Sequence, residues 1–217
     1  MSKQEIISSL SQIPGVSDTA ARTLYNAGAR SKSDLRKPEL YQLLSREAKF
    51  NVRYKIARRI TKQQMQQLNR ALSNIHPRLI LVGSGRRGVA VSRDIDFLTT
   101  GDLSDVVDKI EDNTKIDLIG VLNCGEMRCS IIVKMGTKMF KVDLFKTTRQ
   151  NMPFALLHLT GSRDFNIRTR AQAKRLGYKL SQYGLFSIET GRRVPNLTTE
   201  RDILKKIKVT YIGPADR

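Results

Sequence analysis

Two aspartates one residue apart, preceded by a Gly- and Arg-rich stretch, are the residues of this sequence best suited to chemistry. The stretch reads GSGRRG at positions 83–88 and is soon followed by Asp94 and Asp96. Alternate side chains of a β-strand share one face, so we expect these two carboxylates to project together. Like charges so close repel unless a cation neutralises them, and an all-oxygen ligand set favours a hard ion such as Mg²⁺.

The GSGRRG stretch, which we expect to form a turn, offers a place for phosphate beside that metal. Backbone N–H groups, the Ser84 hydroxyl and the Arg87 guanidinium are donors of the kind that hold phosphate oxygens. A phosphate group beside a divalent metal predicts phosphoryl or nucleotidyl transfer.

The charge of the chain points to a polyanionic partner. Its 217 residues include 39 Lys and Arg against 20 Asp and Glu, a formal net charge of +19. Residues 1–75 carry 14 basic and 5 acidic residues, residues 76–159 carry 12 and 10, and residues 160–217 carry 13 and 5. Two basic ends around a nearly neutral middle suit a nucleic acid held on both sides of a metal site, although a solvated basic surface is the plainer interpretation.

No segment of the sequence has the pattern of a membrane span or a secretion signal. The chain lacks an apolar run of the length that a transmembrane helix needs, and it lacks a signal peptide. We therefore expect a soluble, intracellular protein with no membrane partner.

The N-terminal residues predict two short helices joined by a tight turn. Apolar spacing indicates a helix over residues 5–11, the segment 13–17 breaks it, and Ser17 or Asp18 can cap a second helix that ends before Gly28. This arrangement is a helix-hairpin-helix, whose turn amides can bind DNA backbone phosphates, or else an ordinary helical hairpin.

The remaining elements must position the aspartates. Helices are expected over residues 40–48, over residues 52–60, from a capping box at Thr61–Gln64, and from a cap at Ser104. Strands are expected over residues 79–82, 94–99, 116–122, 129–134 and 139–145. This order predicts an α+β fold with a mixed or antiparallel sheet covered by helices.

A third acid, Asp143, lies in the last of these strands among apolar neighbours. A buried carboxylate needs a partner, so we expect its strand to lie beside the strand of Asp94 and Asp96.

The motifs together resemble family X DNA polymerases, the polymerase beta-like enzymes. The resemblance rests on GSGRRG, on Asp-x-Asp, on Val-Asp-Leu at 142–144 and on Leu-Thr-Gly-Ser at 159–162. It continues through fingers-like segments at 20–22, 33–37 and 59–65, and through terminal segments at 166–170, 177–178, 183–184 and 199–203. His158 and the segments 124–129 and 178–186 are most similar to the reduced viral form of the family.

The resemblance implies a domain organisation. Residues 1–75 are expected to form helical DNA-binding fingers with the helix-hairpin-helix, residues 76–148 a nucleotidyltransferase palm, and residues 149–217 a small nucleotide-binding thumb subdomain. No lyase domain is expected, because few residues precede the hairpin.

The resemblance also implies roles for single residues. Two Mg²⁺ ions, with Mn²⁺ as a substitute, are expected on the catalytic residues Asp94, Asp96 and Asp143. The implied nucleotide-binding residues are Gly83, Ser84, Arg87, Arg93, His158, Leu159, Gly161 and Asn166. The implied DNA-binding residues are Gly15, Ser17, Lys141 and Arg170.

Two departures from the family pattern and one pair of cysteines bear on function. Ser17 stands where many relatives have glycine, and it would be strained there if a positive φ is required. His158 and Leu159 replace an aromatic pair under the sugar, which predicts weaker rejection of ribonucleotides. The viral likeness favours a disulfide between Cys124 and Cys129, while a pair of reduced thiols, usual inside cells, stays open.

The resemblance thus implies a monomeric, template-directed DNA polymerase that adds dNTPs to a primer 3′-OH and fills short gaps in nicked or gapped DNA during base excision repair. A viral source would place it in the host cytoplasm, in the virus factory, and in the virion. A template-independent nucleotidyltransferase and a catalytically inactive DNA-end-binding protein are the alternatives.

Overall fold

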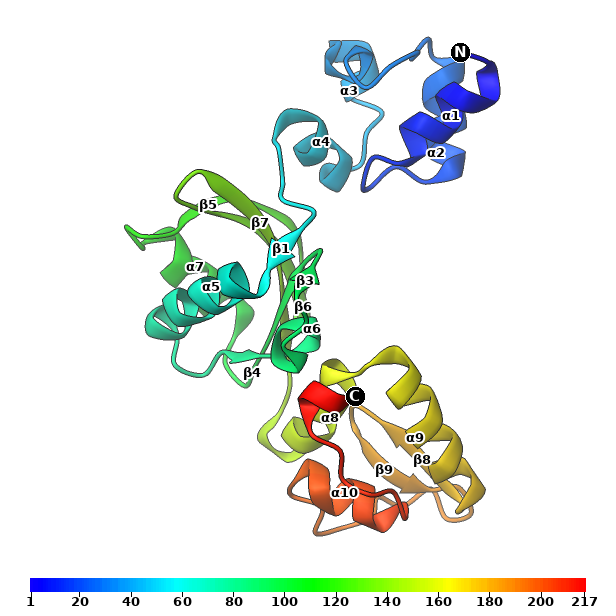
Figure 1. The fold of residues 1–217 in the computed structure, drawn as a ribbon, viewed down its shortest axis with the longest axis vertical. Helices are drawn as coiled ribbons and strands as arrows, with labels where there is room; N and C mark the ends of the chain where they lie inside the picture. The colour runs from blue at the N-terminus through cyan, green and yellow to red at the C-terminus, as the bar shows by residue number, and fades with distance from the viewer. The chain divides into compact units, whose positions relative to one another are not determined.

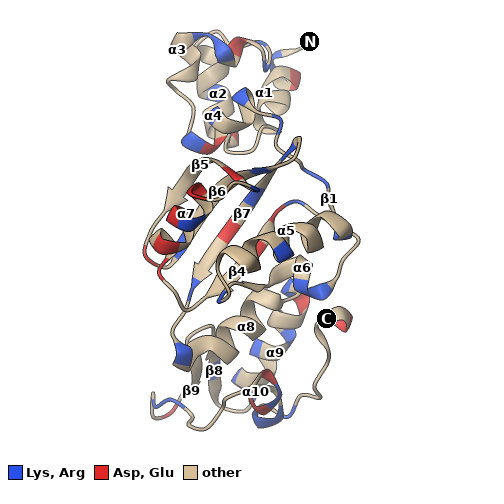
Figure 2. Cartoon of the chain, turned by 90° about the vertical axis from the view of Figure 1, so that its left-hand side faces the viewer, with Lys and Arg blue, Asp and Glu red and all other residues tan.

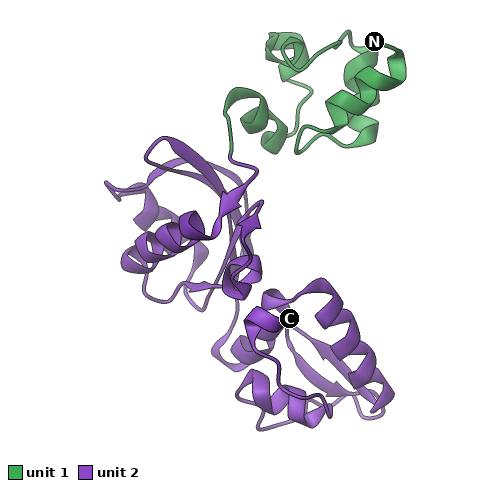
Figure 3. Cartoon of the chain, viewed as in Figure 1, with its two compact units in different colours: residues 1–56 green, residues 57–217 purple.

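The computed structural model describes residues 1–217 and divides them into two compact units, residues 1–56 and 57–217 (Figure 3). Each unit has its own buried apolar core. The helix over residues 62–75, which the sequence analysis placed in the fingers, belongs to the second unit. The division into fingers, palm and thumb at residues 75 and 148 stays a prediction.

The first unit is entirely helical (Figure 1). Its elements are α1 (Lys3–Ser11), α2 (Asp18–Asn26), the 3₁₀ helix η1 (Asp34–Arg36), α3 (Pro38–Tyr41) and α4 (Arg46–Arg53). The two predicted N-terminal helices are present, and Ser17 caps the second by accepting the Ala20 N–H at 3.1 Å. Gly28 follows this helix with φ +103°.

The turn between α1 and α2 requires glycine at position 15. Gly15 has φ +86°, and a Cβ there would lie 2.6 Å from the backbone N of Ala48. Ser17, by contrast, has φ −75° and an extended backbone suited to an N-cap. The condition for strain at Ser17, a positive φ, is therefore not met, because the residue with positive φ is Gly15, two positions earlier.

Two predicted helices of this region do not form as expected. The helix over 40–48 is interrupted at residues 42–45, and Ser45 caps the helix that follows: its hydroxyl accepts the Ala48 N–H at 3.2 Å and donates to the Gly15 carbonyl at 2.7 Å. The helix over 52–60 is absent, because α4 ends at Arg53 and the strand β1 (Ile60–Thr61) pairs with β3 (Val91–Ser92). Capping and strand pairing outweigh helical spacing at these places.

A mixed sheet forms the centre of the second unit. Its order is β2-β4-β7-β6-β5, and the pair β4–β7 is parallel while the others are antiparallel. The strands are β2 (Ile80–Leu81), β4 (Ile95–Thr99), β5 (Asp117–Cys124), β6 (Arg128–Met135) and β7 (Lys138–Lys146). All five predicted strands and the mixed type of sheet are confirmed.

Two helices, α5 (Lys62–Ile75) and α7 (Leu103–Glu111), pack on this sheet and share its core (Figure 1). The predicted capping box is present, since Thr61 and Gln64 exchange side chain to backbone hydrogen bonds. The predicted cap at Ser104 is wrong, because α7 already begins at Leu103 and Asp102 is its N-cap residue.

The GSGRRG stretch, predicted as a turn, forms the short helix α6 (Gly83–Arg87) between β2 and β3. Gly88 ends this helix in the left-handed conformation with φ +70°. A left-handed residue directly after a helix is favoured by glycine. The motif is therefore a short helix with a glycine cap rather than a loop.

The last third of the chain builds a separate core around Phe154, Phe165 and Ile203. Its elements are η2 (Arg149–Asn151), α8 (Met152–Thr160), α9 (Arg163–Arg175), the hairpin β8 (Tyr178–Ser181) and β9 (Gly184–Ser187), α10 (Glu200–Lys206) and η3 (Pro214–Asp216). The chain then returns toward the sheet, so that η3 contacts α6 (Figure 1).

Charged residues are distributed unevenly over the helices of the second unit (Figure 2). Helix α7 carries Asp105, Asp108 and Glu111, whereas α9 is strongly basic. None of the helices has both the length and the apolar character needed to cross a membrane.

Candidate active site

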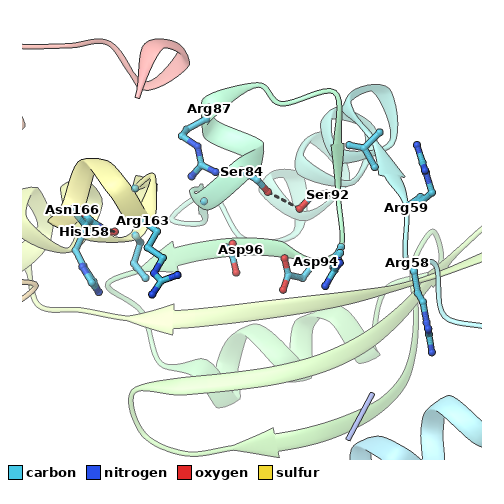
Figure 4. Close-up of a pocket in the computed structure, with 15 residues that line it drawn as sticks. Arg58, Arg59, Ser84, Arg87, Ser92, Asp94, Asp96, His158, Arg163 and Asn166 are labelled. Atoms are coloured by element: carbon cyan, nitrogen blue, oxygen red, sulfur yellow. Dashed lines mark hydrogen bonds between the residues drawn. The ribbon is translucent and has the colours of Figure 1, made fainter. Parts of the chain in front are cut away.

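A cavity of about 770 Å³ in the second unit collects most of the predicted site residues (Figure 4). The predicted residues that line it are Gly83, Ser84, Arg87, Arg93, Asp94, Asp96, His158, Leu159, Gly161 and Asn166. The sequence analysis therefore identified both paired aspartates and every proposed nucleotide contact as neighbours in space. In Figure 4, Asp94 and Asp96 lie between a group containing His158 and Asn166 and a group containing Arg58 and Arg59.

Helix α6 holds the phosphate-type donors at the wall of this cavity. The Ser84 hydroxyl lies 2.6 Å from the Ser92 hydroxyl on β3 (Figure 4). Arg87 Nη1 donates to the Thr160 carbonyl at the end of α8. A Cβ at Gly161 would come within 3.2 Å of that same nitrogen, so the absent side chain leaves room for the guanidinium.

The third acid lies directly beside the first two. Asp96 on β4 and Asp143 on β7 are register partners in the parallel pair, and Asp94 immediately precedes β4. Partners in register project to the same face of a sheet. The expectation that the strand of Asp143 adjoins that of Asp96 is confirmed.

Asp143 is 3% exposed and bonded by protein donors. The Ser130 hydroxyl donates to its Oδ1, and Arg128 Nη2 lies 3.3 Å from its Oδ2. Lys141 Nζ lies 4.0 Å from the same Oδ2. The buried carboxylate is thus satisfied without any ligand.

Asp96 has an unusual acidity. Its pKa is raised from 3.8 to about 7, mainly by burial and then by the charges of Asp94 and Asp143, while the charges of Arg128 and Lys141 act in the opposite direction. Desolvation and neighbouring carboxylates both disfavour the ionised form. At this position the fold has collected more negative charge than its own cations neutralise.

The side chains of Asp94, Asp96 and Asp143 are of the kind that binds a hard divalent cation, although their carboxylate groups are not clustered around a single point. No three Asp, Glu, His or Cys side chains of the structure are grouped closely enough to hold a metal ion. Mutual repulsion and the bonds of Asp143 to Ser130 and Arg128 account for this spread. The donor set is all oxygen, and a Cβ at Gly83 would collide with Asp96 Oδ2, so the glycine reserves the space beside that carboxylate.

His158 has a defined tautomer. Its Nδ1 lies 2.7 Å from Arg170 Nη2, and because a guanidinium can only donate, Nδ1 accepts and Nε2 carries the proton. Burial, together with the positive charge of Arg170, lowers the pKa of His158 below its usual value. Asn166 Nδ2 donates to the His158 carbonyl at 2.7 Å, which ties α9 to the end of α8.

Some cavity residues were missed from the sequence, and some predicted residues lie elsewhere. The missed lining residues are Arg58, Arg59, Val91, Ser92 and Arg163. A signal for Arg163 was its position directly after Leu-Thr-Gly-Ser, and Arg58 and Arg59 belong to a basic run. Asp143, Lys141 and Arg170 do not line the cavity, and Gly15 and Ser17 belong to the first unit.

The two cysteines form a disulfide. Cys124 and Cys129 are register partners on β5 and β6 and are bonded through their Sγ atoms. The structure thus has the oxidised pair rather than the reduced thiols that the sequence analysis left open.

Comparison with known proteins assigns the class. Residues 155–217 match the family model described as DNA polymerase beta thumb. The chain is 34% identical over 142 residues to "Repair DNA polymerase X" of African swine fever virus (isolate Pig/Kenya/KEN-50/1950), covering 64% of this chain and 80% of that protein.

Two cellular proteins extend the likeness. "DNA polymerase/3′-5′ exonuclease PolX" of Bacillus subtilis (strain 168) is 29% identical over 62% of this chain and 23% of its own length. "DNA polymerase lambda" of Rattus norvegicus is 26% identical over 98% of this chain and 42% of its own length. The enzyme class is therefore a DNA polymerase. Within that class, the chain belongs to family X, the polymerase beta-like DNA polymerases.

Proposed function

We propose that this protein is a DNA-directed repair polymerase that adds single dNTPs to a primer 3′-OH and fills short gaps during base excision repair. The observation that carries the proposal is one cavity lined both by Asp94 and Asp96 and by the donors of α6, with Asp143 in register beside Asp96. The name of the viral relative supports the repair role, and the names of the cellular relatives support DNA polymerisation.

In this proposal the cavity wall binds the incoming nucleotide. Ser84 and Arg87 hold triphosphate oxygens, and Arg93 adds a further positive charge at the same wall. His158 and Leu159 contact the sugar, and Asn166 contacts the base edge. Each of these groups binds or orients the substrate without changing its covalent bonds.

Asp94, Asp96 and Asp143 are the residues that would hold two Mg²⁺ ions, with Mn²⁺ as a substitute. When bound, such ions supply neutralisation of charge on the attacking and leaving oxygens of an in-line displacement. Asp143 also helps to accept the proton of the primer hydroxyl. Lys141, whose Nζ lies 4.0 Å from Asp143 Oδ2, orients the primer end in this proposal.

The DNA contacts of the proposal lie in both units. In the first unit, the tight turn at Gly15 and Ser17 presents backbone amides suited to duplex phosphates without reading sequence. In the second unit, the basic helix α9 offers Arg170 to the template strand. An origin in a large DNA virus, with activity in the host cytoplasm, completes the proposal.

The test is primer extension on one-nucleotide-gapped, single-stranded and blunt DNA, with and without Mg²⁺. We expect Mg²⁺-dependent addition of the templated nucleotide, most efficient on gapped DNA. Asp96→Ala should lower incorporation at least about 100-fold while the affinity for gapped DNA stays near that of the wild type. The matched control is Asp108→Ala, which removes an acid from the exposed face of α7.

The other outcomes have definite meanings. Untemplated extension of single-stranded primers would replace the proposal with a template-independent transferase. DNA binding with no incorporation by the wild type would indicate a DNA-end-binding protein. Substantial turnover by Asp96→Ala would refute the assignment of the paired aspartates.

A further inference from the structure

A buried glutamate joins the nucleotide-binding helix α6 to residue 217. Glu200, the first residue of α10, is 7% exposed. Its Oε2 accepts from Arg86 Nη2 at 2.6 Å, and its Oε1 accepts from Arg86 Nη1 at 3.1 Å and from Arg217 Nη1 at 2.7 Å. Three segments far apart in the sequence thus meet at one carboxylate.

Arg217 is itself held in one place. Its side chain is fully buried, and its Nε donates to the Ile212 carbonyl at 2.9 Å. The guanidinium lies over the rings of Phe165 and Tyr211, with 4.9 and 5.6 Å to their centroids. A planar guanidinium fixed by a hydrogen bond and two aromatic faces can orient the carboxylate that it binds.

The other partner of Glu200 lies on the same helix as the phosphate-type donors. Arg86 lies in α6 next to Arg87 and near Ser84. Arg87 and Ser84 line the cavity. Arg86 Nη1 also donates to the Thr160 hydroxyl, while Arg87 donates to the Thr160 carbonyl. The two arginines therefore hold the end of α8, directly before the cavity residue Gly161, from two sides.

The two arginines, Arg86 and Arg217, stabilise the ionised form of the buried Glu200 carboxylate. Burial alone would raise the pKa of Glu200, but hydrogen bonds from Arg86 and Arg217 outweigh it, and the net pKa is lowered. Removing one member of a buried ionic cluster leaves the others without full compensation, so the remaining groups rearrange. Such a cluster serves better to fix a geometry than to add stability.

We propose that Glu200 and Arg217 are positioning residues for the incoming nucleotide. They hold Arg86, and through it they hold α6 against the end of α8, so that Ser84, Arg87 and Gly161 keep their places in the cavity. Neither residue lines the cavity, so both act through Arg86. The inference rests on the proposed binding of a dNTP at this wall.

The test compares Glu200→Gln, Arg217→Ala and the double variant in single-nucleotide gap filling. The KM for dNTP should rise roughly 2- to 30-fold in each single variant, the range expected when a coupling network is cut. The kcat should stay within about twofold, because the network holds the site equally before and during the reaction. The affinity for gapped DNA, measured without dNTP, should not change.

The double variant and a neighbour provide controls. Because both residues act on Arg86 through one path, the double variant should raise KM by less than the product of the single effects. Arg201→Ala is the matched control, since Arg201 also lies over Tyr211, at 4.4 Å, but has no bond to Glu200. It should leave KM unchanged.

Several results would overturn the inference. These are a wild-type KM in the folded single variants, an equal rise in Arg201→Ala, and effects that multiply in the double variant. If Glu200→Gln does not fold, Arg217→Lys, which keeps the charge but not the planar fork, gives the same comparison. Absence of incorporation by the wild type would instead refute the proposed function, so the two failures are distinguishable.

Discussion

Asp96 on β4 and Asp143 on β7 are direct partners in the only parallel strand pair of the five-stranded sheet. The pairing sets two carboxylates on one face, with Asp94 just outside the same strand. The raised pKa of Asp96 is the electrostatic sign of that crowding, and burial is its largest cause.

The first prediction concerns stability and pH in the metal-free protein. With a folded pKa of about 7 against 3.8 as the ordinary value, Asp96 keeps a proton in the folded state that it loses on unfolding. Stability contributed by this group is therefore lost as pH rises between these two values. Asp96→Asn cannot titrate, so its melting temperature in EDTA should exceed that of the wild type by a margin that grows from pH 4 to pH 7 and then levels off.

Differential scanning calorimetry over that pH range measures the margin, with each kcal/mol corresponding to about 2–4 °C for a chain of this size. A margin independent of pH would show that Asp96 titrates normally.

The second prediction concerns the glycine beside Asp96. Gly83 has φ +59°, and a Cβ there would collide with Asp96 Oδ2. Gly83→Ala should therefore move the carboxylate as well as strain the backbone, and incorporation should fall about 100-fold, as expected when a reacting group is misplaced by an ångström. Single-turnover gap filling measures the loss.

Gly88→Ala separates the two effects of that substitution. Gly88 has φ +70°, but the nearest atom to its added Cβ is Lys62 Nζ at 3.6 Å. Both alanine variants should lose about 1–2 kcal/mol of unfolding free energy from the left-handed conformation, but only Gly83→Ala should lose most of its activity. Equal losses of activity would show that backbone strain alone is responsible.

The third prediction concerns the hydroxyl that orients Asp143. Ser130 donates to Asp143 Oδ1 from the neighbouring strand β6. Without this bond the carboxylate loses its fixed direction, so Ser130→Ala should raise the Mg²⁺ concentration for half-maximal activity about 10- to 100-fold. Thr99→Ala is a suitable control, because Thr99 is also buried in the sheet but its hydroxyl accepts from the Gly101 N–H and does not contact Asp143. A similar shift in both variants would contradict a role specific to Asp143.

The fourth prediction concerns the choice of sugar. The Nδ1 of His158 is occupied by Arg170, so Nε2–H is its donor, and a hydroxyl of a ribose would be an acceptor for it. We expect His158→Phe to raise the preference for dNTP over rNTP roughly 2- to 10-fold, the value of one hydrogen bond. Competing incorporation of the two nucleotides at a single gap measures the preference. An unchanged ratio would assign the sugar choice to Leu159 or to the backbone.

The core of the site could be predicted from the sequence because its residues lie in short, continuous motifs. The Asp-x-Asp spacing sets a shared strand face, and the apolar run around Asp143 predicts a strand that needs a polar neighbour. Both expectations depend only on local periodicity and on the burial of charge.

The features that were missed depend on contacts between distant segments. The hydroxyl of Ser45, at the break in one predicted helix, bonds the distant Gly15 carbonyl. Ile60, at the end of another predicted helix, instead pairs with Ser92 as part of a β-strand. No local pattern reveals that Arg86 meets Glu200, because the two are brought together only when α8 packs against both α6 and α10. Tertiary contacts of this kind override local propensity.

The parallel pairing of β4 with β7 also has a consequence for the order of folding. The whole meander of β5 and β6 lies between the two strands in the chain, so Asp143 reaches Asp96 only after a long loop has closed. Contacts of high sequence separation form late, because the entropy of loop closure precedes their gain. During refolding, nucleotide incorporation should therefore recover later than the helical content measured by circular dichroism.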